Sequence, residues 1–155
     1  MPIQTLEPIL AEHPFLKGLR QEHLQLLIGC ASNAKFAVGD FICREGEEAN
    51  HFYILREGKV TIEIPAGHRH GIVIETIGSG DVLGWSWVVA PYRWRFDARV
   101  TEPTRAVALD AKCLRGKCGQ DHELGFELLN RVLQVVEQRL QSTRMQLLDM
   151  YGGEQ

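Results

Sequence analysis

The chain has 155 residues and a formal net charge of −3 at pH 7; 45% of its residues are hydrophobic and 24% are charged. This length and composition are typical of one soluble globular domain. The slightly acidic balance gives no overall attraction to nucleic acid or to an anionic membrane. No apolar stretch approaches the roughly 20 residues that a membrane span needs, and the N-terminus lacks the features of a signal peptide. We therefore expect a cytoplasmic protein without membrane contact.

Residues 5–30 carry a helical pattern in two short pieces, which Pro14 separates. The second piece places Leu24, Leu27 and Ile28 at helical spacing. We expect two small helices here, covering one end of a sheet.

From Ala34 to Leu109 apolar residues alternate with polar ones, in segments rich in β-branched and aromatic side chains. Turn signals separate the segments, namely Gly39-Asp40, Glu45-Gly46, Glu57-Gly58 and Gly78-Ser79-Gly80. This spacing predicts an antiparallel sandwich or barrel. Gly39 and Gly58 are expected in tight hairpins, where glycine tolerates a positive φ. The predicted fold class is mainly β with helices (α+β), built on an antiparallel β-roll or jelly roll.

All three tryptophans fall within residues 80–98, where the alternating pattern is interrupted. The candidate ligand-binding residues of this stretch are Gly84, Trp85, Ser86, Trp87, Arg93, Trp94 and Arg95. The step that begins at Gly84 can expose backbone N–H groups at the start of a short helix, a geometry that holds phosphate. Arg93 and Arg95 supply a counter-charge. In the alternative interpretation, the tryptophans belong to the core and the arginines to a solvated rim.

The helical period returns after Leu109 and continues to the end of the chain. Asp121 is expected to cap the long last helix and Gly152-Gly153 to end it. Seven residues form a heptad register on it: Leu129, Leu133, Val136, Leu140, Thr143, Leu147 and Met150. About 30 helical residues span about 45 Å, more than one small domain needs, so this seam predicts a homodimer. In the alternative the helix folds back on its own sheet, for which Leu128, Val132 and Val135 offer a separate face.

The four cysteines, Cys30, Cys43, Cys113 and Cys118, contain no C-x-x-C pair. In a chain of this size that is not exported, we interpret them as reduced and mostly buried thiols. A regulatory disulfide between Cys113 and Cys118, five residues apart, is the alternative.

The chain thus divides into N-terminal helices (1–32), a β-roll (33–110) and C-terminal dimerisation helices (111–151), all within one structural domain. With its motifs, this order resembles the cyclic-nucleotide-binding domain of the Crp/Fnr regulators and of kinase regulatory subunits, over about positions 12–150. H-P-F-L-K-G-L is similar to the family's opening, and V-G-D-F-I-C-R-E-G-E-E-A-N-H-F-Y-I-L-R-E-G-K-V to its first hairpins. I-G-S-G-D-V-L-G is similar to the entry of its phosphate-binding cassette. The resemblance implies an eight-stranded roll interrupted by a short glycine-led helix.

The cassette itself, residues 84–95, departs from the family's pattern. That pattern reads F-G-E-[LI]-[AG]-L, followed nine or ten residues after the Glu by an Arg. The Glu accepts the ribose 2′-OH, and the Arg pairs with the cyclic phosphate. Here Trp85 occupies the position of the Glu, and Trp94 that of the Arg, with Arg95 as the nearest substitute. Because those partners are missing, ordinary cyclic AMP recognition is not expected. The pocket is then either retuned for another small anionic or aromatic-stacked ligand, or filled by its own tryptophans.

The end of the chain is a second departure from the regulators. Crp/Fnr transcription factors follow the long helix with a helix-turn-helix domain, whereas this chain stops at Gln155. We therefore expect a stand-alone domain that does not bind DNA directly.

A metal site is the competing chemistry. His68, His70 and Glu75 spell H-x-H-x-x-x-x-E, which resembles the first metal-binding motif of cupins. The preceding P-A-G marks a hairpin tip, and no second motif supplies a further histidine, so two exposed loop histidines are the simpler interpretation. No catalytic nucleophile–base pair is evident, and G-W-S-W is not the G-x-S-x-G elbow.

The resemblance implies a regulatory or sensor module that is not an enzyme. It would bind a small ligand, such as a cyclic nucleotide or another small anion, in residues 84–95 and signal through its C-terminal dimer helix. A ligand-free protein-interaction scaffold is the rival hypothesis, and a cupin-like metal site comes third. The sequence identifies no certain cofactor, and the partner protein stays unknown.

Overall fold

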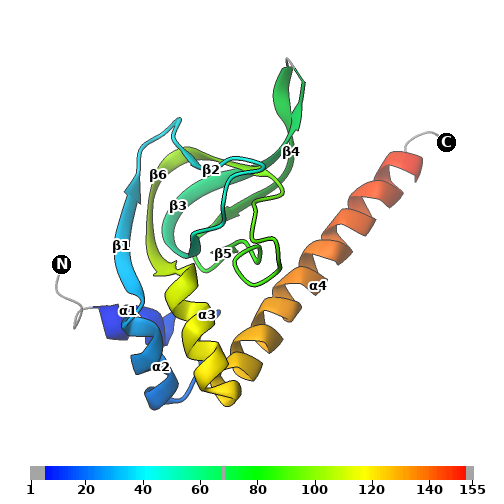
Figure 1. Cartoon of the computed structure of the whole chain (residues 1–155). Helices are drawn as coiled ribbons and strands as arrows, with labels where there is room; N and C mark the ends of the chain where they lie inside the picture. The colour runs from blue at the N-terminus through cyan, green and yellow to red at the C-terminus, as the bar shows by residue number, and fades with distance from the viewer. Residues whose placement is uncertain (1–5, 68, 153–155) are drawn as a thin grey trace.

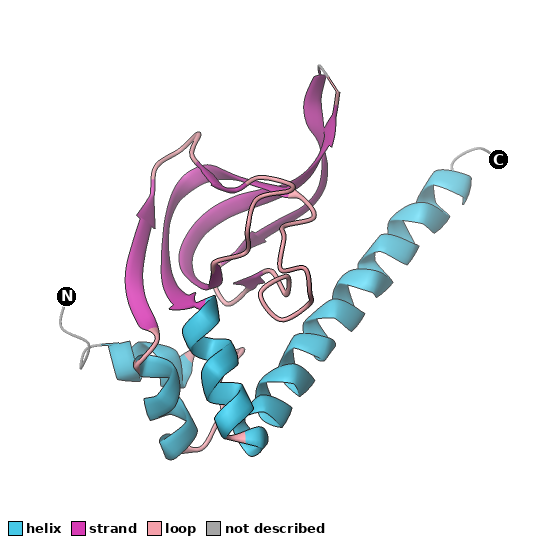
Figure 2. Ribbon diagram, viewed as in Figure 1, coloured by secondary structure: helices cyan, strands magenta, loops and turns pink. Residues whose placement is uncertain are grey.

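The computed structural model describes residues 6–67 and 69–152 and shows a β-roll with helices at one end and along one side (Figures 1 and 2). In chain order the elements are α1 (Leu6–Glu12), α2 (Gln21–Ile28), β1 (Ala31–Phe36), β2 (Phe41–Cys43), β3 (His51–Ala66), β4 (Arg69–Gly78), β5 (Val82–Leu83), β6 (Asp97–Asp110), α3 (Ala111–Gln120) and α4 (His122–Gly152). The sheet therefore begins at Ala31, inside the region that the sequence assigned to N-terminal helices.

The strands form one antiparallel sheet, and the predicted fold class is confirmed. The path is β1-β6-β3-β4, with β2 added to β6 and β5 added to β3. Strand β6 is central because it pairs with β1, β2 and β3 along its length. Strand β4 pairs with β3 alone and forms an edge of the sheet.

The prediction of a hairpin at Glu57-Gly58 is wrong, because β3 continues through this pair as one strand of 16 residues. Gly58 has the expected positive φ of 106°, but it accommodates a close approach of β6. A Cβ at this position would lie 2.6 Å from the carbonyl oxygen of Pro103. The pairing register shifts on both sides of Gly58, so the irregularity is a bulge that bends the strand. Gly39, by contrast, lies in the turn between β1 and β2 with a φ of 92°.

Two separate groups of buried apolar residues form the core. The helix-side core joins α1, α2, α3 and α4 to the outer face of β3 and β6; its largest members include Phe52, Trp87, Leu109 and Leu114. The roll core fills the inside of the sheet with Leu55, Val60, Leu83, Trp94, Phe96 and their neighbours. The two cores lie on opposite faces of the same strands, since successive side chains of a strand alternate between faces.

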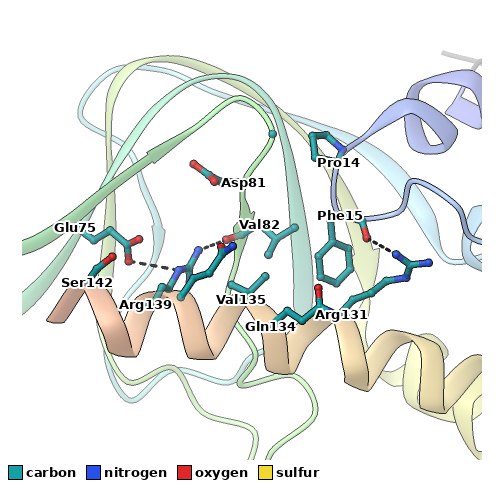
Figure 3. A pocket seen from close by; sticks show the side chains of 12 residues that line it. Pro14, Phe15, Glu75, Asp81, Val82, Arg131, Gln134, Val135, Arg139 and Ser142 are labelled. Atoms are coloured by element: carbon teal, nitrogen blue, oxygen red, sulfur yellow. Dashed lines mark hydrogen bonds and ion pairs between the residues drawn. The ribbon is translucent and has the colours of Figure 1, made fainter. Parts of the chain in front are cut away.

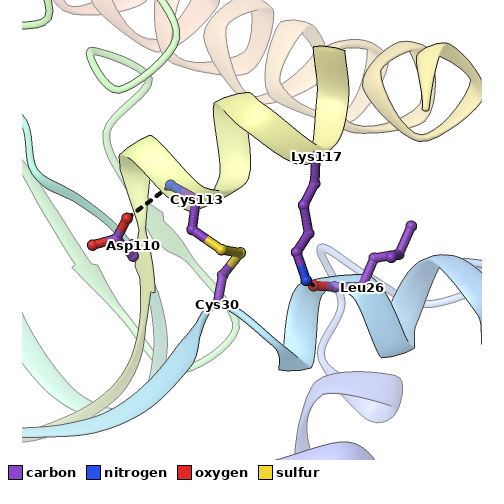
Figure 4. The surroundings of a disulfide bond; sticks show 5 residues. All are labelled: Leu26, Cys30, Asp110, Cys113 and Lys117. Atoms are coloured by element: carbon purple, nitrogen blue, oxygen red, sulfur yellow. Dashed lines mark hydrogen bonds between the residues drawn. A yellow bond between two sulfur atoms is a disulfide. The ribbon is translucent and has the colours of Figure 1, made fainter. Parts of the chain in front are cut away.

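The prediction of reduced cysteines is wrong, and so is the alternative Cys113–Cys118 pair. Cys30, directly after α2, forms a disulfide with Cys113 in the first turn of α3, with their Cα atoms 5.8 Å apart (Figure 4). Lys117 reinforces the junction by donating from Nζ to the carbonyl oxygen of Leu26 at 2.9 Å. The sequence alone did not predict this pairing, because the two cysteines are 83 residues apart. Of the other cysteines, Cys43 is buried and Cys118 half-buried, and both are free thiols.

Helix α4 begins as predicted, with the Asp121 carboxylate accepting a hydrogen bond from the backbone N–H of Leu124 at 3.1 Å. Its first half packs into the helix-side core through Leu124, Leu128 and Val132. Its second half runs along the side of the roll (Figure 1), where Gln146 donates from Nε2 to the carbonyl oxygen of Ile74 on β4 at 3.2 Å, and residues 140–152 are all exposed. Within the described part of the chain, no helix has the length and apolar character needed to span a membrane.

Candidate ligand site between the β4–β5 corner and the long helix

The cassette is a series of turns, so the prediction of a short helix with open N–H groups is wrong. The N–H of Val88 donates to the carbonyl oxygen of Trp85 at 3.1 Å, and the N–H of Tyr92 donates to that of Val89 at 2.9 Å. Ser86 is buried, with 5% of its surface exposed. The stretch therefore presents no helix N-terminus of the kind that binds phosphate.

Trp94 occupies the space beside Gly84. Gly84 has a φ of 88°, and a Cβ there would lie 2.7 Å from Cη2 of the Trp94 ring. The Trp94 indole is 4% exposed and stacks on Tyr53 with ring centroids 6.5 Å apart. Its backbone is held by the loop after β2, because the N–H of Trp94 donates to the carbonyl oxygen of Glu47 at 2.9 Å. The side of the cassette that faces the roll is therefore closed by an indole.

The two cassette arginines, Arg93 and Arg95, are both solvent-exposed. Arg93 donates from Nη1 to the carbonyl oxygen of Gly46 at 2.8 Å. A depression of about 420 Å³ beside Trp94 is bordered by the acidic residues Glu47 and Glu48. Negative charge at this opening disfavours a phosphate.

Trp87 belongs to the other side of the cassette, where it is 1% exposed and stacks on Phe52 with centroids 5.2 Å apart. Arg115 of α3 donates from Nη1 to the carbonyl oxygen of Trp87 at 2.7 Å. The same guanidinium lies 4.1 Å from the ring centroid of Tyr92, within the range of a cation–π contact. Helix α3 is thereby fastened to the cassette at two points.

Arg139 links α4 to three other parts of the molecule, and Figure 3 shows its contacts with Glu75 and Val82. Its Nε lies 3.3 Å from Oε2 of Glu75 on β4, and its Nη2 donates to the carbonyl oxygen of Val82 on β5 at 2.5 Å. Its guanidinium also lies 5.2 Å from the ring centroid of Trp85 in the cassette. One side chain thus connects the long helix to the edge strand, the strand before the cassette and the cassette.

Both members of this ion pair are partly shielded from water, with 13% of the Arg139 side chain and 29% of the Glu75 side chain exposed. Burial lowers the pKa of Arg139, and the nearby carboxylate of Glu75 opposes that shift. Burial raises the pKa of Glu75, and the guanidinium of Arg139 opposes that shift. Arginine nevertheless stays charged at neutral pH because its ordinary pKa is so high. The pair is therefore a desolvated contact in which each charge depends on the other.

A groove of about 320 Å³ lies between α4 and the corner that joins β4 to β5. Its lining residues are Pro14, Phe15, Glu75, Gly80, Asp81, Val82, Arg131, Gln134, Val135, Gln138, Arg139 and Ser142 (Figure 3). Gln134, Gln138 and Ser142 are spaced by four residues and so lie along one face of the helix. The volume lies at the lower end of the range for small-molecule sites, roughly 300–1,000 Å³. The groove presents donors and acceptors to a small polar molecule.

The cupin-like motif gains no support from this geometry. The carboxylate of Glu75 faces Arg139, His68 lies outside the described residues, and the side chain of His70 is not described. Over residues 6–67 and 69–152, no group of three or more possible metal ligands is found.

Sequence reasoning missed the arginines that organise the site, namely Arg115, Arg131 and Arg139. Arg131 donates from Nη1 to the carbonyl oxygens of Phe15 at 3.3 Å and Lys17 at 3.2 Å, closing the N-terminal end of the groove. A signal was available, because Arg131 and Arg139 are eight residues apart and lie on one face of a helix. Nothing comparable marks Arg115.

The family model for the cyclic nucleotide-binding domain matches residues 34–121, more than half of the chain. The chain belongs to the cyclic nucleotide-binding domain family. It is 26% identical to a CRP-like cAMP-activated global transcriptional regulator of Mycobacterium tuberculosis over 145 residues, 94% of this chain and 63% of that protein. It is 37% identical to human cGMP-dependent protein kinase 2 over 70 residues, 44% of this chain and 9% of the kinase. The chain thus covers less than two thirds of either relative.

Solved structures of the family share the fold. A putative cyclic nucleotide-binding protein from Geobacter metallireducens is 25% identical, with a TM-score of 0.76 over 90% of this chain and 98% of that one. A cyclic nucleotide-binding domain from Methylobacillus flagellatus has a TM-score of 0.78 at 16% identity, over 96% of this chain and 83% of that one.

Proposed function

We propose that this family member is a regulatory module that binds a small polar ligand in the groove and transmits binding through α4. The observation that carries the proposal is the position of Arg139. It contacts β4, the carbonyl of Val82 and the ring of Trp85 from the same helix that lines the groove. The proposal includes a cytoplasmic location, no catalytic step and no direct contact with DNA.

A ligand in this groove would touch two parts of the molecule, the long helix and the corner between two strands. One wall is α4, through Gln138 and Ser142, and the other is the β4–β5 corner, through Asp81 and Val82. A ligand shifts a conformational equilibrium only as far as it prefers one arrangement over the other. A molecule that bridges both walls has that preference, because its contacts depend on the distance between them.

The groove favours a ligand with hydrogen-bonding edges, such as a nucleobase, over one recognised by its phosphate. Amide and hydroxyl groups can donate and accept at the same time, and the face formed by Gln134, Gln138 and Ser142 provides three of them. The cyclic-phosphate position of the family is closed by Trp94, and Arg93 and Arg95 are exposed. In this proposal the base-like part of the ligand provides most of the contacts, and the cassette takes part through Trp85, which lies beside Arg139.

Homodimerisation through α4 is the second part of the proposal. The face with Leu128 and Val132 is buried in the chain's own core, whereas most of the heptad seam is free: Leu129, Leu133, Leu140, Leu147 and Met150 are 48–71% exposed. Thr143 is exposed on the same helix and Val136 is half-buried. Because the two faces are distinct, one helix can pack on its own domain and on a second copy.

The ligand is tested by a thermal-shift series with cyclic AMP, cyclic GMP, cyclic dinucleotides, linear nucleotides and free nucleosides. At a hundredfold excess over Kd, a true ligand adds about 2.7 kcal/mol to the free energy of unfolding. Gln138→Ala is expected to weaken binding about tenfold. Its matched control is Gln141→Ala, an exposed glutamine of the same helix outside the groove. Equal effects of the two substitutions contradict the groove assignment.

The dimer is tested by light scattering on the full chain. Leu133 is 63% exposed, so Leu133→Asp leaves the fold of a single chain intact and places a charge in the seam. We expect a shift from dimer to monomer, with no change for the exposed control Asn130→Asp. A wild-type chain that is monomeric at micromolar concentration removes this part of the proposal.

A ligand-free protein-interaction scaffold is the second candidate function. It is favoured by the closed cassette and by the exposed apolar residues Ile72, Val73 and Ile74 on the edge strand. This alternative is selected if no compound of the thermal-shift series changes the melting temperature while the chain is a dimer. The search then moves to protein partners of the dimer.

A further inference from the structure

Another cavity, lined mostly by polar side chains, lies on the outer face of the roll and shares no residue with the groove. It measures about 210 Å³ and is lined by Asn33, Ala34, Lys35, Arg56 and Arg105, which come from β1, β3 and β6. Strand β1 and helix α4 lie on opposite sides of the roll (Figure 1), so the proposed ligand groove does not extend here. Three of the five lining residues carry a positive charge in a chain whose net charge is −3.

The strand pairing forces two of these charges together. Lys35 and Arg105 are direct cross-strand partners in the β1–β6 ladder. Side chains directly opposite each other have Cβ atoms about 5 Å apart, and like charges in that arrangement destabilise a sheet. Arg56 adds a third charge, because the β3–β6 register shifts between Leu55 and Glu57 and leaves Arg56 as the extra residue of a bulge. Bulges of this kind redirect a side chain toward a site.

The surrounding residues neutralise little of this charge. Within the described residues, one of the three cations has an acidic partner: Nε of Arg105 lies 3.7 Å from Oε1 of the exposed Glu57. None of the cavity's lining residues is acidic. The fold therefore concentrates three cations and one amide around a cavity and leaves most of the positive charge free for a ligand.

We propose that this cavity binds a small phosphate-type anion. Two guanidinium groups and an ammonium group match the oxygens of a phosphate or pyrophosphate, since arginine donates in a planar fork to two oxygens at once. The Asn33 amide supplies a further donor. The cavity is smaller than the roughly 300 Å³ at which sites for drug-sized molecules begin, so it fits one or two phosphate groups and excludes most of a larger molecule. The bound anion relieves the repulsion between Lys35 and Arg105.

The probe for this site is inorganic pyrophosphate, titrated calorimetrically into the full chain at low ionic strength. Saturable binding is expected, and Arg56→Gln and Arg105→Gln should each weaken it about tenfold or more. Arg144→Gln removes the same charge from the exposed end of α4 and is the matched control, with less than a twofold change expected. Glu57→Gln removes the competing carboxylate and should tighten binding two- to threefold, again as an order-of-magnitude estimate.

Three outcomes overturn the proposal. One is an absence of saturable binding up to about 10 mM, which corresponds to a negligible affinity. Another is an equal loss of binding in Arg144→Gln, because the binding would then depend on the net charge of the chain and not on this cavity. The third is that a short DNA duplex binds more tightly than pyrophosphate and that Arg56→Gln and Arg105→Gln abolish this DNA binding. This face would then be a nucleic-acid surface.

The melting temperature without added anion gives an independent readout. Lys35→Gln removes the like-charge pair and should raise the melting temperature by about 1–3 °C. Pyrophosphate should raise the melting temperature of the wild-type chain and have little effect on this variant. A lower melting temperature for Lys35→Gln in anion-free buffer contradicts the repulsion on which the site depends.

Discussion

The two sides of the cassette differ in what they contact and in what they leave open. On the side toward the roll, Trp94 stacks on Tyr53, covers Gly84 and belongs to the roll core. On the side toward the helices, Trp87 belongs to the helix-side core, and Trp85 lies beside Arg139 and lines an apolar depression against α4. The comparison shows that the tryptophans form no single cluster. Trp94 fills the space beside Gly84, whereas Trp85 leaves a partly open apolar surface against α4, with Arg139 as its charged neighbour.

The largest effect is expected from removing Trp87, which is 1% exposed and stacks on Phe52. Trp87→Ala should lower the free energy of unfolding by about 3–5 kcal/mol, because it leaves a cavity in the helix-side core. Chemical denaturation measures this loss. The control is Trp85→Ala at a half-buried position, which should cost at least about 1 kcal/mol less. Equal losses contradict the division of the cassette between a closed core and a partly open edge.

Breaking the disulfide tests how far the helix side depends on a covalent link. The Cys30→Ser/Cys113→Ser double variant should lose about 2–4 kcal/mol of stability, since the bond closes a long loop in the unfolded chain. Amide hydrogen exchange should rise in α2 and α3 more than in β3 and β6. Cys118→Ser, which removes a free thiol, is the control and should change little. A double variant as stable as the wild-type chain argues against the bond in solution.

Particular residues show why the sequence predicted the fold better than the site. Alternation of apolar residues and the turn glycines depend on near neighbours, so the roll, both short helices and the cap at Asp121 were predictable. The disulfide and the contacts of Arg115 and Arg139 depend on which strands pair, and local pattern does not encode this. Gly58 illustrates the limit: a glycine with positive φ fits a hairpin as well as a bulge. The sequence left open whether Trp94 lines a pocket or fills it, and the structure places its ring beside Gly84.

The smallest effect concerns His13, in the loop between α1 and α2. Burial lowers the pKa of His13 below its ordinary value of 6.5. Its Nδ1 accepts from the N–H of Phe15 at 3.1 Å, so the neutral ring carries its proton on Nε2, which lies 2.9 Å from the carbonyl oxygen of Leu55. The folded state therefore binds this proton less readily than the unfolded state.

Because the folded pKa is the lower one, the stability contributed by His13 is complete above pH 6.5 and declines as the pH falls further. The slope is at most about 1.4 kcal/mol per pH unit for one group. Denaturation at pH 7 and pH 5 should show this loss in the wild-type chain and in His122→Gln, which alters an exposed histidine. His13→Gln should flatten the pH dependence. An unchanged slope in His13→Gln would assign the effect to other groups.

Because Trp94 fills the space beside Gly84, we propose that a cyclic phosphate has no binding position there. The most direct test compares cyclic AMP with adenosine in calorimetric titrations of the wild-type chain and of Arg95→Ala. We expect cyclic AMP to bind no more tightly than adenosine, within about threefold, and Arg95→Ala to change neither affinity. Cyclic AMP that binds at least about tenfold more tightly than adenosine, with the difference abolished in Arg95→Ala, would contradict it. That result would mean that Trp94 moves aside and that the cassette still recognises a cyclic phosphate.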